Sequence, residues 1–117
     1  MNISTRYLVP GLFLLASLQG VAGQPAARLG DATSQGGSIV QGSPTVIIGG
    51  LPAARLNDQT VSPLVVFPVA CVGGPILQGS HTVLINGLPA ARLGDLANSV
   101  CGPATIVTGE PTVLIGN

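Results

Sequence analysis

Pro-Ala-Ala-Arg-Leu-Gly-Asp, at residues 89–95, is the last of three near-copies of one heptad. The other copies stand at residues 25–31 and, with Asn in place of Gly, at residues 52–58. A second block, of the type Gly-Ser-Pro-Thr-Val-Ile-Ile-Gly, recurs at residues 42–49, 79–86 and 109–116. A short unit that recurs in this way predicts a body built from equivalent repeats, so the repeat takes precedence over any local pattern.

The composition predicts an all-β protein of one domain. Of the 117 residues, 46% are hydrophobic but only 3% are aromatic, and there is no Trp. The core must therefore consist of Val, Ile, Leu and Ala, while 17 Gly and 10 Pro turn the chain often. This balance favours many short strands over helices.

The charge content excludes some partners. Charged residues make up 7% of the chain, against about 25% in ordinary soluble domains, and the formal net charge is zero. Because no basic patch can form, we expect no binding to nucleic acid and no electrostatic attraction to an anionic membrane.

Most of the charges belong to the heptads. Apart from Arg6 and Glu110, every charged residue is the Arg or the Asp of a repeat: Arg28 and Asp31, Arg55 and Asp58, Arg92 and Asp95. Three Arg could form a binding cluster, but their identical recurrence favours a structural pair that closes a turn in each repeat.

Residues 1–23 lie outside the repeat. One basic residue, Arg6, precedes a short apolar run, and Val21-Ala22-Gly23 resembles a small-residue cleavage site. This is the pattern of a secretory signal peptide, although Pro10 and Gly11 interrupt the run. A wrongly assigned start and a short anchor are the two alternatives.

The spacing separates fixed segments from variable loops. From the Gly that opens a block to the next Arg the distance is 13 residues both times (42 to 55, 79 to 92). From Arg to the next such Gly it is 14, 24 and 17. The fixed segments are expected to carry the fold, and the loops after the Asp to tolerate insertions.

Each fixed segment predicts small antiparallel strands. The β-branched block is followed by Gly49-Gly50 or Asn86-Gly87, which favour two-residue hairpin turns, and the heptad would return as the next strand of a meander. The glycines are interpreted as turn residues. The domain, residues 24–117, begins with an unpaired heptad and ends with an unpaired block, so the two should pair and close a short, conical, three-sided body with pseudo-three-fold symmetry.

These heptads and blocks resemble the PAAR-repeat family, named after Pro-Ala-Ala-Arg. The resemblance implies a non-enzymatic tip on the trimeric, VgrG-type spike of a type VI secretion system or a contractile phage tail. Such a tip docks through its base, helps to puncture a target membrane and carries effector proteins. It would stay in the cytoplasm until assembly and then leave the cell at the spike tip. The alternative is a module exported through the N-terminal segment, which binds in the envelope and is stabilised by a disulfide.

The resemblance also implies a metal, usually zinc, near the apex, held mostly by His with one Cys. Gln35, Cys71 and Cys101 occupy three of the family's ligand positions, and each precedes a repeated Ile by four or five residues. The remaining family His falls at residues 59–62, which contain no His. Because structural zinc takes four N or S ligands, the two Cys could bind zinc, form a disulfide or remain buried thiols.

No catalytic residues can be assigned from the sequence. It contains no spaced Ser, His and Asp set and no phosphate-binding loop, and its one His, His81, aligns with Pro44 and Pro111 in a turn. We therefore expect His81 to be exposed, and the protein not to be an enzyme.

Overall fold

A computed structural model describes residues 23–117, and the predicted leader lies almost wholly outside this range. The described residues form no helix and thirteen short strands, which confirms the all-β prediction. All strand pairs are antiparallel. The strands are β1 (Gln24–Ala26), β2 (Ser38–Ile39), β3 (Ile47–Ile48), β4 (Leu51–Pro52), β5 (Thr60–Val61), β6 (Val65–Val66), β7 (Val69–Ala70), β8 (Gly73–Ile76), β9 (Leu84–Ile85), β10 (Leu88–Pro89), β11 (Leu96–Ser99), β12 (Ala104–Thr105) and β13 (Glu110–Ile115).

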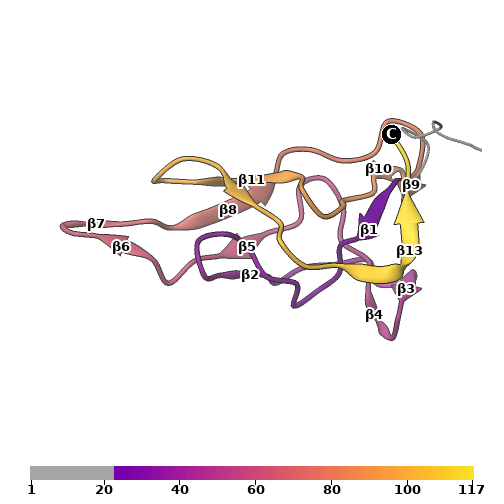
Figure 1. The fold of residues 1–117 in the computed structure, drawn as a ribbon, viewed down its shortest axis with the longest axis horizontal. Coiled ribbons are helices and arrows are strands. Elements are labelled where there is room, and N and C mark those ends of the chain that lie inside the picture. The colour runs from indigo at the N-terminus through magenta and orange to yellow at the C-terminus, as the bar shows by residue number, and fades with distance from the viewer. Residues whose placement is uncertain (1–22) are drawn as a thin grey trace, which may run out of the picture.

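The body is elongated and narrows toward one end (Figure 1). It measures 57 × 34 × 21 Å. We call the broad end, which carries the hairpins β3–β4 and β9–β10 together with β1 and β13, the base. We call the hairpin β6–β7, which forms the opposite end, the tip.

Three heptads meet at the centre of the body in a closed ring of backbone hydrogen bonds. The N–H of Ala27 donates to the carbonyl of Ala91 (3.0 Å), Ala91 to Ala54 (3.0 Å), and Ala54 back to Ala27 (2.9 Å). A second cycle lies one step along and runs in the opposite direction, because the N–H groups of Leu29, Leu56 and Leu93 donate to the carbonyls of Pro52, Pro89 and Pro25. Such a cycle requires three equivalent segments around one axis, which is the predicted pseudo-three-fold symmetry.

The core repeats with the same symmetry. Ile39, Ile76 and Ile106 are at most 1% exposed and pack with the three ring alanines in one cluster. A second cluster toward the base contains Ile85 and Ile115 with further heptad alanines. Small alanines at the axis let the three backbones approach closely, and the isoleucines fill the volume around them.

The two ends of the domain pair as predicted. β1 lies antiparallel to β13, with Gln24 opposite Ile115 and Pro25 opposite Leu114. Each of the other two heptads pairs with the block that directly precedes it in the chain. The first heptad has no preceding block and pairs with the last block instead. This pairing closes the body.

The predicted meander within each repeat is wrong. β4 pairs with β3, as expected of a hairpin, but it does not continue back to β2. β2 pairs instead with β5, which follows the next heptad, and β8 pairs with β11 in the same manner. The reason is that the heptad residues after β4 are engaged at the axis, where Ala53 bridges Arg28 and Arg55 bridges Ala90.

The repeated glycines have two different roles. At the turns Gly49-Gly50 and Asn86-Gly87 all four φ angles are positive, as a two-residue hairpin turn requires. The block-opening glycines, Gly42, Gly79 and Gly109, are not in this conformation. A Cβ on any of them would lie 2.8 Å from the proline or alanine of a heptad. Their interpretation as turn residues is therefore wrong, because close backbone approach excludes a side chain there.

Candidate functional site

Each heptad carries one buried carboxylate that binds its own arginine. Asp58 is 4% exposed and accepts hydrogen bonds from the backbone N–H (2.8 Å), Nε (3.0 Å) and Nη2 (2.9 Å) of Arg55. Arg92 and Asp95 repeat this geometry. In the first heptad the backbone N–H of Arg28 lies 2.6 Å from Asp31, and Nε 3.5 Å. Each pair is therefore built into its own turn, and in the described part of the chain no ion pair joins one heptad to another.

The free arm of each arginine reaches the last residue of a block that is distant in the chain. Nη1 of Arg28 contacts Gly49 O (3.4 Å), Nη1 of Arg55 contacts Asn86 Oδ1 (3.0 Å) and Nη1 of Arg92 contacts Gly116 O (3.2 Å). Sequence reasoning missed these contacts because the partners lie 21 to 31 residues away. Each arginine thus joins one turn within a repeat to the base of another.

Removal of one of these carboxylates is expected to destabilise the fold. Asp58→Ala leaves the backbone N–H of Arg55 without its acceptor and its guanidinium without a carboxylate partner, at a cost of about 2–4 kcal/mol in the free energy of unfolding. Asp58→Asn, the matched control, keeps an acceptor for the N–H and should cost less. Chemical denaturation measures both, and equal losses would show that the buried N–H contributes nothing.

Glu110, which lies outside the heptads, forms an ion pair with Arg28. It occupies the position of the last block at which the other two blocks have Ser43 and Ser80. Its Oε1 lies 3.0 Å from Arg28 Nη1. Hydrogen bonds from the hydroxyl (2.7 Å) and backbone N–H (3.2 Å) of Thr112 lower its pKa, with a smaller contribution from the charge of Arg28. The pair ties the last block to the first heptad.

Replacing the hydroxyl donor should shift this titration. Thr112→Val removes the largest cause of the lowered value, so the pKa of Glu110 is expected to rise toward that of an ordinary glutamate. Because a lowered pKa means that folding favours the carboxylate, this contribution is present above the ordinary pKa and is lost as the pH falls through the lowered one. A carbon-13 NMR titration measures the pKa, and an unchanged value would refute the assignment.

The base exposes a large aliphatic side chain at the same position of each repeat. Ile47, Leu84 and Leu114 occupy the same position of the three blocks and are 56%, 61% and 54% exposed. Val40, Leu77 and Val107 form a second equivalent set and are 43–50% exposed. The symmetry of the fold thus places apolar surface evenly around its axis, and we call Ile47, Leu84 and Leu114 the base triad.

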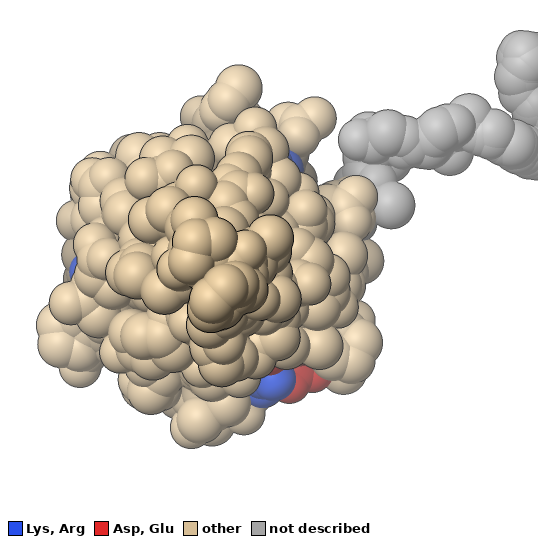
Figure 2. Space-filling model, turned by 90° about the vertical axis from the view of Figure 1, so that its left-hand side faces the viewer, with Lys and Arg blue, Asp and Glu red and all other residues tan. Residues whose placement is uncertain are grey.

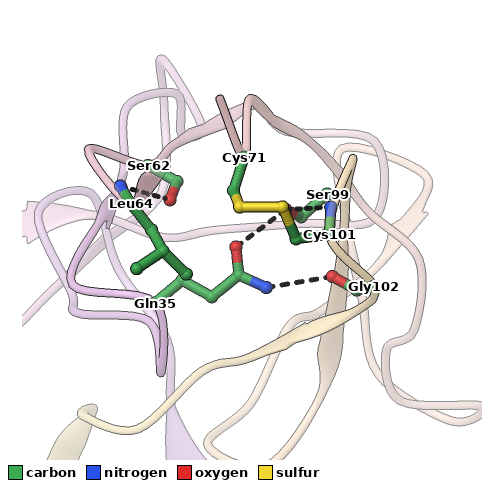
Figure 3. Close-up of a disulfide and its surroundings, with 7 residues drawn as sticks. All are labelled: Gln35, Ser62, Leu64, Cys71, Ser99, Cys101 and Gly102. Carbon is green, nitrogen blue, oxygen red and sulfur yellow. Dashed lines mark hydrogen bonds between the residues drawn. A yellow bond between two sulfur atoms is a disulfide. The ribbon is translucent and has the colours of Figure 1, made fainter. Parts of the chain in front are cut away.

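The three candidate ligands lie together near the tip, but not as a metal site (Figure 3). Cys71 and Cys101 form a disulfide, in which Cys71 is fully buried and Cys101 is exposed. The Gln35 amide accepts a hydrogen bond from Ser99 Oγ (2.7 Å) and donates one to Gly102 O (3.0 Å). The pseudo-three-fold axis therefore brings together the residues that the sequence placed in equivalent positions.

This donor set does not fit zinc. Both sulfurs are engaged with each other, and both ends of the Gln35 amide are hydrogen-bonded. Within residues 23–117 no three or more His, Cys, Asp or Glu side chains gather at one point. His81, which is exposed, belongs to the turn before β9 at the base. The disulfide and the Gln35 amide occupy the place where the family resemblance implied a metal.

Comparison with known proteins gives one assignment. No curated protein matches the chain. Separately, none of the described residues belongs to a helix long and apolar enough to cross a membrane. The family model of the PAAR motif matches residues 29–96 and 68–117. Because these two matches include all three blocks and the last two heptads, the chain belongs to the PAAR motif family.

Proposed function

We propose that this protein caps the trimeric spike of a type VI secretion system or a related contractile injection machine. The observation that carries the proposal is the base triad, which offers the same apolar contact three times around one axis. A single chain can match a three-fold symmetric partner on all sides only if it repeats its own contacts three times.

Burial of the base would also stabilise the complex. Exposed aliphatic side chains gain free energy when a partner removes them from water, and a partner that binds only the folded protein stabilises it. With the base covered, β6–β7 becomes the leading end. The role requires no catalysis: the protein would act through its shape and position, and effectors would be carried by docking.

The test is co-purification with a trimeric β-helical spike protein. Leu84→Asp places a charge within the proposed contact and is expected to weaken binding at least about ten-fold. Val66→Asp is the matched control, because Val66 lies at the tip and its exposure is similar to that of Leu84 (57% against 61%). This variant should bind as the wild-type protein does. No binding by the unchanged protein, or an equal loss in both variants, would overturn the proposal.

The disulfide favours a second candidate, an exported module that binds in the cell envelope. Disulfides form and persist in oxidising compartments, whereas a spike cap would stay in the reducing cytoplasm until assembly. Fractionation and N-terminal sequencing separate the two. A mature chain that starts near Gln24 in the envelope supports export, and a full-length chain in the cytoplasm supports the spike cap.

A further inference from the structure

The tip is an apolar hairpin with unusual exposure. Val65 and Val66 in β6 are 58% and 57% exposed, Val69 in β7 is 46% exposed, and Phe67 at the turn is 92% exposed. Residues 59–80 contain no charged side chain. Viewed onto the tip, the molecule presents uncharged surface, with charges only at the rim of the view (Figure 2). An apolar patch of this kind usually marks a site of interaction.

We propose that the β6–β7 hairpin inserts into the interfacial region of a lipid bilayer. The hairpin protrudes, and its successive residues, which point to opposite faces, are exposed on both. A protein partner would need a deep pocket to cover all sides of such a hairpin. A fluid bilayer covers it without a fitted pocket, and the lack of charge removes the main cost of entry.

The backbone hydrogen bonds of the hairpin are suited to the interfacial region of a bilayer. Val65 pairs with Ala70 and Val66 with Val69, and the N–H of Cys71 donates to the carbonyl of Leu64 (2.9 Å). These pairs satisfy the backbone groups that face the partner strand. The groups at the two open edges need water or lipid headgroups as partners, because open sheet edges do not occur in the hydrocarbon region, so insertion is confined to the interfacial region.

The length of the hairpin sets the depth. From Leu64 to Phe67 the chain advances three residues, or about 10 Å at ~3.3 Å per residue. This reaches the boundary between headgroups and acyl chains, about 5–10 Å deep, and falls far short of the ~30 Å hydrocarbon core. The hairpin would therefore lie in one leaflet. The disulfide at Cys71, directly after β7, fixes its foot to the β11–β12 loop.

This inference goes beyond the spike cap, because insertion would need only lipid. It can therefore fail while the spike cap holds, and the reverse is also true. The base triad serves as the internal control, since its residues are as exposed as those of the hairpin but lie at the opposite end.

The experiment uses the absence of Trp from the chain. Phe67→Trp and, as control, Leu84→Trp each introduce one tryptophan into the full-length protein, which is mixed with phosphatidylcholine vesicles that carry brominated acyl chains. Insertion predicts at least two-fold quenching of the tryptophan at position 67 and little quenching at position 84. Quenching should be unchanged with 30% phosphatidylglycerol, because the tip is uncharged. No quenching at position 67, or equal quenching at both positions, would overturn the proposal.

Vesicle co-sedimentation supplies a second measurement. Val66→Asp is expected to lower the partition coefficient at least about ten-fold, whereas Leu84→Asp should leave it unchanged. Residues 1–22 are the same in both variants, so a difference between them reports on the hairpin. Equal partitioning of the two variants contradicts insertion through the tip. Light scattering provides a further check. If the wild-type protein is a dimer and Val66→Asp is a monomer, insertion is also contradicted, because the tip would then bind a second copy of the chain.

Discussion

Ile76→Ala is expected to lower the free energy of unfolding by about 2–5 kcal/mol, the usual cost of truncating a fully buried Ile. Ile76 is 0% exposed and packs beside Ile39, Ile106 and the ring of alanines. The ring is held by backbone hydrogen bonds, so its alanines cannot move inward to fill the space. We therefore expect a value in the upper half of that range, which is a large part of the 5–15 kcal/mol typical of a small domain.

The neighbouring residue supplies the control. Leu77 is 50% exposed, so Leu77→Ala should change the unfolding midpoint little. If Ile76→Ala does not fold, Ile76→Val, with an expected loss of about 0.5–1.5 kcal/mol, allows the same measurement by chemical denaturation. A loss no greater than that of Leu77→Ala would contradict the described core.

Repetition is what made the fold predictable. Because the heptad and the block each occur three times, one local interpretation could be checked against two others. The leftover heptad at residues 25–31 and the leftover block at residues 109–116 then determined the closing pair, β1–β13. Within residues 24–117 no helical pattern competed with this interpretation, since the apolar residues there form short runs, many of them β-branched, between Gly and Pro.

Pairing between repeats could not be predicted in this way. A meander satisfies the same local pattern as the observed arrangement, in which β2 pairs with β5 across a nested hairpin. The choice depends on the ring of Ala27, Ala54 and Ala91, whose hydrogen bonds join residues far apart in the chain. The contacts of the arginines with distant turns were missed for the same reason.

The candidate site was predicted only in its position. Alignment of the repeats brought Gln35, Cys71 and Cys101 to one place, and the structure has them together. Which chemistry they carry depends on the distances between their side chains, and spacing along the chain does not give these distances. The apolar hairpin β6–β7 lies in the longest of the three loops, which the spacing predicted only to tolerate insertions.

Removing the disulfide is the second prediction with a large effect. The bond joins residues 30 apart, and closing a loop of that length in the unfolded chain corresponds to about 3–4 kcal/mol of stability. The double variant Cys71→Ala/Cys101→Ala, and the unchanged protein in the presence of a phosphine reductant, should therefore lose similar amounts in chemical denaturation.

The reductant and a chelator distinguish the alternatives for the two cysteines. If the cysteines form a disulfide, the reductant lowers the stability of the wild-type protein but not that of the double variant. A zinc chelator then changes the stability of neither protein. With a zinc site, the chelator would destabilise the unchanged protein and metal analysis would find about one equivalent. With buried thiols, neither reagent would act. Cys101 is an exposed residue, and an unchanged midpoint after complete reduction would refute a stabilising disulfide.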